Sequence, residues 1–363
     1  MKEGFTFDDV LIIPKFSEIK SRKDVDLSTS IGNKTYHLPI VSANMDTVTE
    51  VKMANILSKY GAVGCLHRFW SIENNVKAFK EAPSAWVSVG VGELEAERAK
   101  ALYEAGARTI VIDVANGAQQ QIVEQYLTLK ELCLSAHFVI GNFATRKSIE
   151  EFIGRCGYMY YADAIEDMSF KVGIGPGSAC TTRIKTGVGV PQLSAIIDCV
   201  SSGQTIIADG GMKTPGDIAK ALAAGAKMVM LGGMLAGTKE TPVYGKALKE
   251  HLALKTVRNI LTMKNIPTTE ENFYVETLTY RGSASKESYE AQGKDESWRT
   301  AEGVAITIPY KGPVSEVLRD IEGGLRSAIT YVGAKNLKEF SQTAEFIRVT
   351  GNSVVENNAH GKT

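Results

Sequence analysis

Residues 86–114 read WVSVGVGELEAERAKALYEAGARTIVIDV, and this stretch holds the unit that decides the fold. Two short runs of apolar and β-branched residues, 86–91 and 109–114, flank a segment with apolar residues at helical spacing, 94–105. Runs that are apolar without strict alternation are typical of strands buried on both faces. The stretch therefore predicts a strand, a helix and a second strand in succession.

The same unit recurs along the chain. Helical spacing also marks residues 50–60, 119–134 and 214–224. An open dinucleotide-binding sheet would place G-x-G-x-x-G after its first strand, and none follows Ser42. We therefore predict an α/β protein with a closed (β/α)8 TIM barrel. Its eight strand-like runs occupy residues 39–42, 62–66, 86–91, 109–114, 138–141, 170–174, 205–208 and 228–231.

The chain is longer than a barrel requires. A barrel needs about 250 residues, and the chain has 363. We assign the excess to an N-terminal arm (1–35), a C-terminal tail and a segment after the eighth strand (238–302). That segment is a polar loop rich in Lys, Glu, Ser and Thr on the catalytic side, which favours a mobile flap over a second domain. We expect residues 1–363 to form a single catalytic domain.

The composition excludes several classes of protein. The 41 Lys and Arg residues balance the 41 Asp and Glu residues, so a nucleic-acid or anionic-membrane partner is not expected. Apolar residues make up 44% and charged residues 23%, which is typical of a folded globular protein. No stretch of about 18 apolar residues occurs, and the start, MKEGFTFDDV, lacks the apolar core of a signal peptide.

The cysteines and histidines give little sign of disulfides or of a metal cluster. The five cysteines form no C-x-x-C pair, and the five histidines form no H-x-x-x-H pair. An odd number of cysteines, in a chain long enough to build its own core, fits a reducing compartment. We therefore expect a cytoplasmic protein.

The active site of a (β/α)8 barrel lies at the carboxyl ends of its strands. There the sixth strand is followed by residues 173–183, GIGPGSACTTR. The glycines permit backbone angles closed to other residues, so this loop can turn amides or carbonyls toward an ion. Ser178 is a candidate phosphate ligand, and the loop context favours Cys180 as a nucleophile. A small buried hydrophobe, the usual interpretation of a lone cysteine, fits the other four: Cys65, Cys133, Cys156 and Cys199.

Two glycine pairs follow the last two strands, where barrels usually bind phosphate. Asp209-Gly210-Gly211 follows the seventh strand, and Gly232-Gly233 follows the eighth. Glycine lets amide groups approach phosphate oxygens closely, and Asp209 is a candidate partner for ribose hydroxyls. Each pair alone also fits a tight turn without a ligand. Polar residues that end other strands complete a ring around one mouth: Asn44, Asp46, His67, Arg68, Asp113 and Asn116.

These motifs together resemble the IMP dehydrogenase/GMP reductase family over nearly the whole chain. They are the loop GIGPGSACTTR, DVANG (113–117), ADGG (208–211), LGGM (231–234) and FTFDDVLIIP (5–14). The resemblance implies a (β/α)8 barrel, usually a homotetramer, that acts on a purine nucleoside monophosphate with a nicotinamide cofactor. It also implies a cysteine that attacks purine C2 and forms a covalent intermediate.

Within the family the sequence is most similar to the reductase branch. Dehydrogenases usually carry a pair of CBS modules after the second strand, and the stretch between Arg68 and Trp86 is too short for a CBS module. Asn44 and the run Lys185-Thr186-Gly187 match the reductase pattern. Tyr280-Arg281-Gly282 is instead similar to the dehydrogenase, and Arg68 stands where lysine is usual.

The resemblance implies a role for each matching residue. Cys180 is the nucleophile, and Thr182 and Glu302 handle the proton of the departing ammonia. The nucleotide would be bound by Ser178, Asp209, Gly210, Gly211, Gly232, Gly233, Gly282, Ser283 and Ala284. The cofactor would be bound by Arg68, Asp113, Val114, Ala115, Trp298, Arg299, Ser327 and Thr330, and by Ser21 and Arg22 reaching from a neighbouring subunit. Carbonyls of Gly175, Gly177 and Cys180 would hold a potassium-like ion.

The predicted reaction is the NADPH-dependent conversion of GMP to IMP and ammonia. The alternatives are an IMP dehydrogenase that oxidises IMP to XMP with NAD, and a reductase for dGMP or a modified purine nucleotide. A catalytically silent nucleotide-binding regulator is a third, but binding alone needs no nucleophile such as Cys180. An unrelated barrel with the same phosphate loops is a fourth, since a fold does not fix a function.

Overall fold

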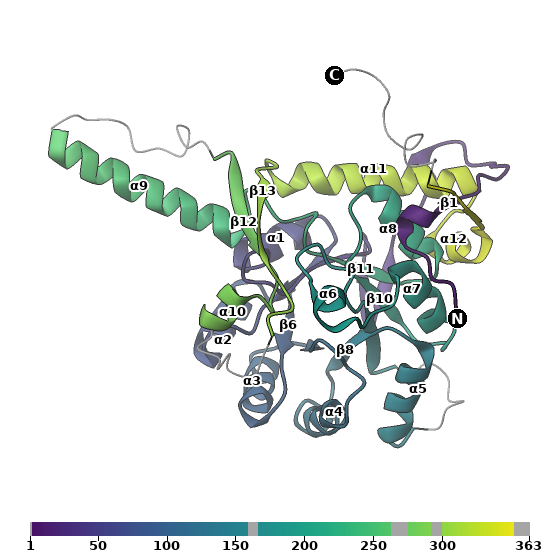
Figure 1. The fold of residues 1–363 in the computed structure, drawn as a ribbon, viewed down its shortest axis with the longest axis horizontal. Helices are drawn as coiled ribbons and strands as arrows, with labels where there is room; N and C mark the ends of the chain where they lie inside the picture. Colours follow the sequence, from purple (N-terminus) through teal and green to yellow (C-terminus); the bar gives the residue numbers. More distant parts are fainter. Residues whose placement is uncertain (1, 159–165, 263–274, 292–299, 352–363) are drawn as a thin grey trace.

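The computed structural model describes residues 2–158, 166–262, 275–291 and 300–351. Its centre is a closed barrel of parallel strands in the spatial order β10-β11-β4-β5-β6-β7-β8-β9, surrounded by helices (Figure 1). The predicted (β/α)8 barrel is confirmed, and each predicted run overlaps one strand. The strands are β4 (Ile40–Ser42), β5 (Val63–Leu66), β6 (Trp86–Val89), β7 (Thr109–Asp113), β8 (His137–Phe143), β9 (Met168–Val172), β10 (Ile206–Asp209) and β11 (Met228–Leu231).

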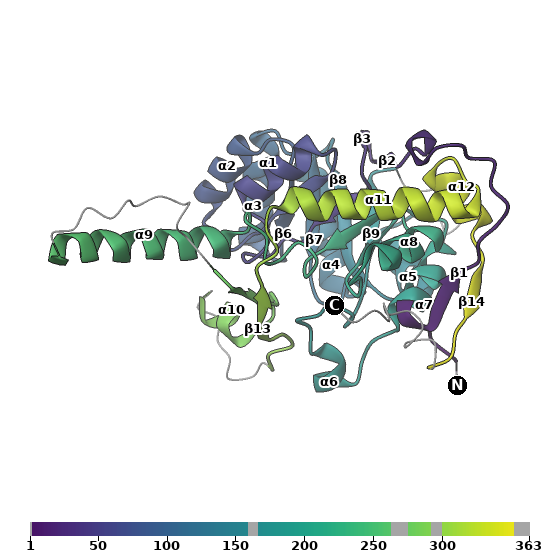
Figure 2. The same cartoon turned by 90° about the horizontal axis from the view of Figure 1, so that it is seen from above.

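The helices form the outer layer. α8 opens on a capping box, in which the Thr214 hydroxyl accepts a hydrogen bond from the Asp217 amide. α11 packs on α8 and completes the layer of helices (Figure 2). The barrel helices are α1 (Val51–Lys59), α2 (Ile72–Glu81), α3 (Glu93–Glu104), α4 (Gln120–Leu132), α5 (Arg146–Arg155), α7 (Gln192–Val200), α8 (Pro215–Ala223) and α11 (Val314–Val332).

Alternate residues of each strand face the barrel interior and the helices. In β7, Val111 packs in the interior cluster, whereas Ile110 and Ile112 pack in the cluster beneath the helices. All three are fully buried, which explains why the strand sequences are apolar without alternation. A hairpin of β2 (Thr29–Ile31) and β3 (Lys34–Tyr36) contributes Ile31 and Tyr36 to the interior cluster. Trp86 Nε1 in turn donates a 2.7 Å hydrogen bond to the Tyr36 hydroxyl.

The N-terminal arm runs along the barrel and pairs with the C-terminal part of the chain. β1 (Val10–Ile12) lies antiparallel to β14 (Phe346–Arg348), which follows α12 (Leu337–Thr343). The arm also contains two single-turn helices, η1 (Phe7–Asp9) and η2 (Arg22–Asp24). The predicted end of the arm at residue 35 falls inside β3.

The segment after β11 contains more regular structure than the sequence predicted. It includes α9 (Pro242–Thr262), β12 (Thr277–Arg281) and α10 (Lys286–Ala291), and β12 pairs with β13 (Ala305–Pro309). The expectation of a polar loop is wrong for α9, because the run KALKEHLALK (246–255) consists mostly of strong helix formers. α9 points away from the barrel, whereas β12 and β13 lie beside it (Figure 1 and Figure 2). None of the helices in the described ranges has the length and apolar character that a membrane span requires.

Candidate active site

A cavity of about 490 Å³ lies at the carboxyl ends of the barrel strands. It is lined by residues that lie at the ends of seven of the strands or follow them, and by parts of the segment after β11. Parallel strands bring their carboxyl ends to one mouth, so residues far apart in the sequence meet there. The predicted site residues that line it are Arg68, Asp113, Val114, Ala115, Gly175, Gly177, Ser178, Cys180, Thr182, Asp209, Gly210, Gly211, Gly232, Gly233, Gly282, Ser283, Ala284 and Glu302.

The cysteine loop is held in place by hydrogen bonds at both ends. The Cys180 amide donates to the Gly177 carbonyl over 3.0 Å, and the Thr181 amide donates to the Glu302 carbonyl over 2.8 Å. Cys180 Sγ lies 3.2 Å from Thr182 Oγ1, at the start of the short helix α6 (Thr182–Thr186). The three predicted catalytic residues therefore share one wall of the cavity.

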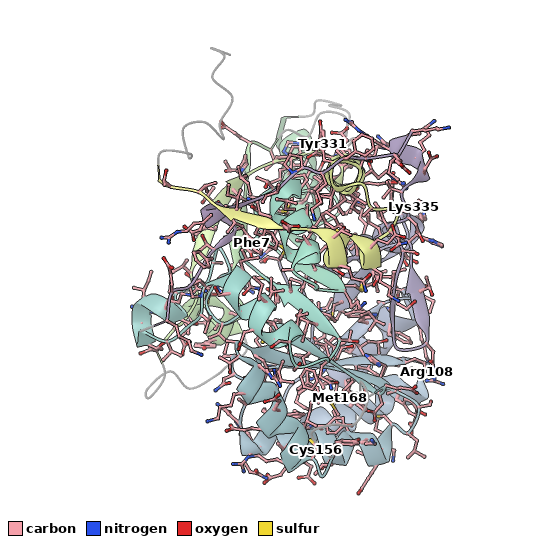
Figure 3. All side chains as sticks on the ribbon, turned by 90° about the vertical axis from the view of Figure 1, so that its right-hand side faces the viewer. Phe7, Arg108, Cys156, Met168, Tyr331 and Lys335 are labelled. Carbon is pink, nitrogen blue, oxygen red and sulfur yellow. The ribbon has the colours of Figure 1, made fainter. Side chains whose placement is uncertain are left out.

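Of the described cysteines, Cys180 alone lines this cavity. Cys65, Cys133 and Cys199 are buried, and burial raises the pKa of the Cys65 thiol well above its ordinary value. Burial also raises the pKa of Cys133 to about 11 and the pKa values of Cys156 and Cys199 to about 12. Cys156 lies at the opposite end of the molecule from Tyr331 of α11 (Figure 3). Cys65, Cys133 and Cys199 are therefore buried as the sequence predicted, whereas Cys156 is only partly buried.

The glycines of the two turns line the cavity, and several amides at these turns are unpaired among the described residues. Among the described residues, the amides of Gly210, Gly211, Gly233 and Met234 donate no hydrogen bond. Gly210 and Gly211 adopt φ angles of 87° and 85°, in the left-handed region that favours glycine. A Cβ atom on Gly233 would meet Ser178 Oγ at 2.8 Å, so Ser178 lies directly against the second turn. Unpaired amides and a hydroxyl at one place are suited to a phosphate group.

A buried lysine that the sequence analysis missed connects the cavity walls. Lys171 lies in β9 with its side chain 2% exposed. Its Nζ lies 2.9 Å from Asp113 Oδ1 and 2.7 Å from Asp209 Oδ2, and it also donates to Asn142. A lysine within the predicted buried strand FKVGI (170–174) was the available signal, because a fully buried lysine needs partners.

The pKa values of Asp113 and Lys171 are shifted in the directions that favour their charged forms. Burial alone would raise the pKa of Asp113, but the Lys171 ammonium and hydrogen bonds from Lys171 and Asn44 outweigh it and lower that pKa. Burial alone would lower the pKa of Lys171, but the Asp113 and Asp209 carboxylates outweigh it and raise that pKa. The Asn44 amide lies 3.0 Å from Asp113 Oδ2. Asp113 and Asp209 are thus two fixed acceptors that share one cation.

The hairpin β12–β13 supplies two more residues that the analysis assigned no role. Tyr280 is 5% exposed, and a Cβ atom on Gly232 would meet its hydroxyl at 2.8 Å. Arg281 forms an ion pair with Asp46 after β4, and it also donates to the Glu287 carbonyl. Asp46, which the sequence placed in the polar ring, therefore holds the hairpin to the barrel.

His67 does not belong to the cavity. Its ring is buried, lies 4.1 Å from the ring of Trp70 between centroids, and approaches Glu50 at 3.5 Å. The described part of the chain contains no group of His, Cys, Asp or Glu residues that could hold a metal ion.

Four predicted cofactor residues lie away from the cavity of their own chain. Ser21 and Arg22 lie beside α11, where Arg326 donates to the Arg22 carbonyl over 3.4 Å, and α11 carries Ser327 and Thr330. None of the four lines the cavity. Trp298 and Arg299 lie outside the described residues.

Known proteins that are similar to this chain come from both branches of one family. The chain matches the IMP dehydrogenase / GMP reductase domain over residues 4–360. The GMP reductases of Escherichia coli O81 (strain ED1a) and Escherichia coli (strain K12 / DH10B) are each 39% identical to it over 361 residues, covering 94% of both chains.

Solved structures from both branches share the fold. A variant GMP reductase from Trypanosoma brucei, in complex with guanosine 5'-monophosphate, has a TM-score of 0.83 and 26% identity, covering 100% of this chain and 99% of that chain. The inosine 5'-monophosphate dehydrogenase of Legionella pneumophila has a TM-score of 0.77 and 40% identity, covering 96% and 99%. The cysteine loop and the glycine turns share one cavity of the barrel, and the family model matches almost the full length of the chain. This chain therefore belongs to the IMP dehydrogenase/GMP reductase family.

Proposed function

We propose that this protein is a GMP reductase, which converts GMP to IMP and ammonia with NADPH as the reductant. The observation that carries the proposal is the placement of Cys180, Thr182 and Glu302 in one cavity with the glycine turns. The reductases of the family at 39% identity support the same reaction. A silent binding protein needs no such nucleophile.

Cys180 is the proposed nucleophile. Its thiolate attacks purine C2 and forms a carbon–sulfur bond, and the C2 amino group takes up a proton and leaves as ammonia. Thr182 Oγ1, at 3.2 Å from Sγ, and the Glu302 carboxyl in the same cavity are proposed to move that proton. Once C2 has received a hydride, the carbon–sulfur bond breaks, which releases IMP and restores the thiolate.

The remaining cavity residues bind the nucleotide. Ser178 and the amides of the glycine turns are proposed to hold the phosphate, and Asp209 the ribose hydroxyls. Gly282, Ser283 and Ala284 line the cavity on the flap side and are proposed to meet the base. Asp209 enters this role as a fixed acceptor, because Lys171 and Asn142 both donate to its Oδ2.

The opposite side of the cavity fits a nicotinamide cofactor. Asp113, Val114 and Ala115 line it, and Arg68 Nε is buried without a hydrogen-bond partner among the described residues. An orphaned guanidinium nitrogen is suited to a polar group of a bound dinucleotide. When bound, the nicotinamide supplies the hydride.

The adenosine end of the cofactor is proposed to lie at a subunit boundary. Ser21, Arg22, Ser327 and Thr330 do not reach the cavity of their own chain. In a homotetramer these residues would complete the cofactor site of a neighbouring subunit, and Arg22 would select NADPH through its 2′-phosphate.

A potassium ion is proposed at the cysteine loop. The carbonyls of Gly175 and Cys180 accept no hydrogen bond from any described residue, whereas the Gly177 carbonyl accepts the Cys180 amide. Unpaired loop carbonyls are suited to a monovalent cation.

An IMP dehydrogenase is the second candidate. Tyr280-Arg281-Gly282 and the 40% identity to the Legionella pneumophila enzyme favour it. The deciding assay follows absorbance of the reduced cofactor with GMP plus NADPH and, separately, with IMP plus NAD. Oxidation of NADPH with GMP should greatly exceed reduction of NAD with IMP, and the reverse ratio would assign the protein to the dehydrogenase branch.

A further inference from the structure

A lysine outside the cavity donates hydrogen bonds to the turn after β11, which contains Gly233 and Met234. Lys311 follows β13, and its Nζ donates to the Gly233 carbonyl over 2.7 Å and to the Met234 carbonyl over 3.2 Å. The Lys311 amide also donates to the Gly237 carbonyl over 2.9 Å. The residue thus ties the hairpin to the turn through its backbone and its side chain.

The two faces of this turn carry opposite polarity. The amides of Gly233 and Met234 are unpaired among the described residues, while the carbonyls of the same two residues accept the Lys311 ammonium. The Gly233 carbonyl and the Met234 amide belong to one peptide group, so the Lys311 ammonium fixes that amide and adds positive charge to the turn. The turn is thereby set to receive an anion on its other side.

Among the described residues, no carboxylate balances the ammonium of Lys311. In the described part of the chain, no Asp or Glu lies within ion-pair distance of Lys311, and half-burial lowers the pKa of its ammonium. By contrast, the two lysines that line the cavity are paired, Lys171 with two carboxylates and Lys213 with Asp8 at 3.2 Å. A half-buried charge without a counter-ion favours binding of an anion nearby.

We propose that Lys311 is a positioning residue for the nucleotide phosphate. It holds the Gly233–Met234 turn in place, and the phosphate is the counter-ion of its ammonium. The inference rests on the proposed function, since the phosphate is that of the purine nucleotide. Lys311 itself does not line the cavity, so it acts on the phosphate through the turn and through its charge.

The test compares Lys311→Met with Lys311→Arg and with Lys227→Met. Lys227 is exposed and directly precedes β11, at the opposite end of the same strand, so it serves as the matched control. Binding of GMP, guanosine and inorganic phosphate is measured by calorimetry, and turnover of GMP gives KM and kcat. Lys311→Met should weaken GMP and phosphate roughly 10- to 100-fold and leave guanosine unchanged. kcat should stay within about threefold, Lys311→Arg should recover most of the affinity, and Lys227→Met should match the wild type.

The outcomes separate this proposal from the proposed function. Equal losses for GMP and guanosine, or no loss for either, would overturn the role of Lys311 even if GMP is turned over. A wild-type protein that binds GMP without turnover would refute the reductase activity, and the binding series would still decide the role of Lys311. If Lys311→Met does not fold, NMR of labelled lysine side chains in the wild type replaces it. The Lys311 resonance should then move with GMP and not with guanosine, and equal responses would contradict the proposal.

Discussion

At the scale of single residues, Lys171 joins the two halves of the cavity. Its ammonium contacts Asp113 on the proposed cofactor side and Asp209 on the proposed nucleotide side. A buried charge is tolerated only when it is paired, and here one cation pairs with two carboxylates. The same contacts fix two acceptors before any ligand arrives, which lowers the cost of ordering the site.

Removing this ammonium should destabilise the fold in a pH-dependent way. Lys171→Met leaves two partly buried carboxylates without their cation, which should cost about 3 kcal/mol of unfolding free energy at neutral pH. The pKa of Asp113 is lowered from 3.8, so its contribution is present above that value and is lost as the pH falls through the lowered pKa. The pKa of Lys171 is raised from 10.5, so its contribution is lost only as the pH rises through the raised pKa.

Denaturant unfolding of both proteins at several pH values checks this expectation. The deficit of Lys171→Met should be largest between about pH 5 and pH 10 and should shrink toward pH 3. Adding Asp113→Asn should recover part of it, because one unpaired charge is removed. A deficit that is the same at pH 3 and pH 7 would show that Lys171 contributes through packing alone.

At the scale of elements, the strands of the barrel could be predicted from the sequence, whereas α9 and the β12–β13 hairpin could not. The strands are buried on both faces, so their apolar runs stand out in the sequence, as in β7. A search for apolar runs does not reveal the role of Lys171. Its partners Asp113 and Asp209 come from other strands, and only the closed barrel brings the three residues together. α9 was missed because its polar composition outweighed its helix-forming residues.

Some residues of the candidate site could likewise be predicted from the sequence, and others could not. The cysteine loop and the glycine turns could be predicted, because the barrel rule places every strand end at one mouth. Tyr280, Arg281 and Lys311 could not, because their roles depend on how the β12–β13 hairpin sits over that mouth. Alternation in TLTYR, with Leu278 and Tyr280 buried, was the available signal for β12.

At the scale of the whole molecule, the proposed cofactor residues fall into two groups. Arg68 and Asp113 line the cavity, whereas Ser21 and Arg22 lie beside α11. An assembly of several copies would unite the two groups. This makes cofactor choice a property of the proposed homotetramer rather than of one chain.

Arg22→Ala tests this arrangement. Loss of a guanidinium–phosphate contact should raise the KM for NADPH roughly tenfold and leave the KM for NADH nearly unchanged. Lys23→Ala, a neighbouring exposed cation, is the matched control and should change neither value. Light scattering on the same samples reports whether the assembly persists. Equal effects of Arg22→Ala on NADPH and NADH would refute the contact with the 2′-phosphate.

The central claim is covalent catalysis by Cys180, and replacing that residue tests it most directly. Cys180→Ala removes only the sulfur, so calorimetry should show GMP binding within roughly tenfold of the wild type. Turnover of GMP should vanish, because Cys180 is the sole thiol among the described residues that line the cavity. Cys199→Ala should keep its turnover and lose about 1 kcal/mol of stability. Substantial turnover by a clean preparation of Cys180→Ala would contradict the covalent mechanism.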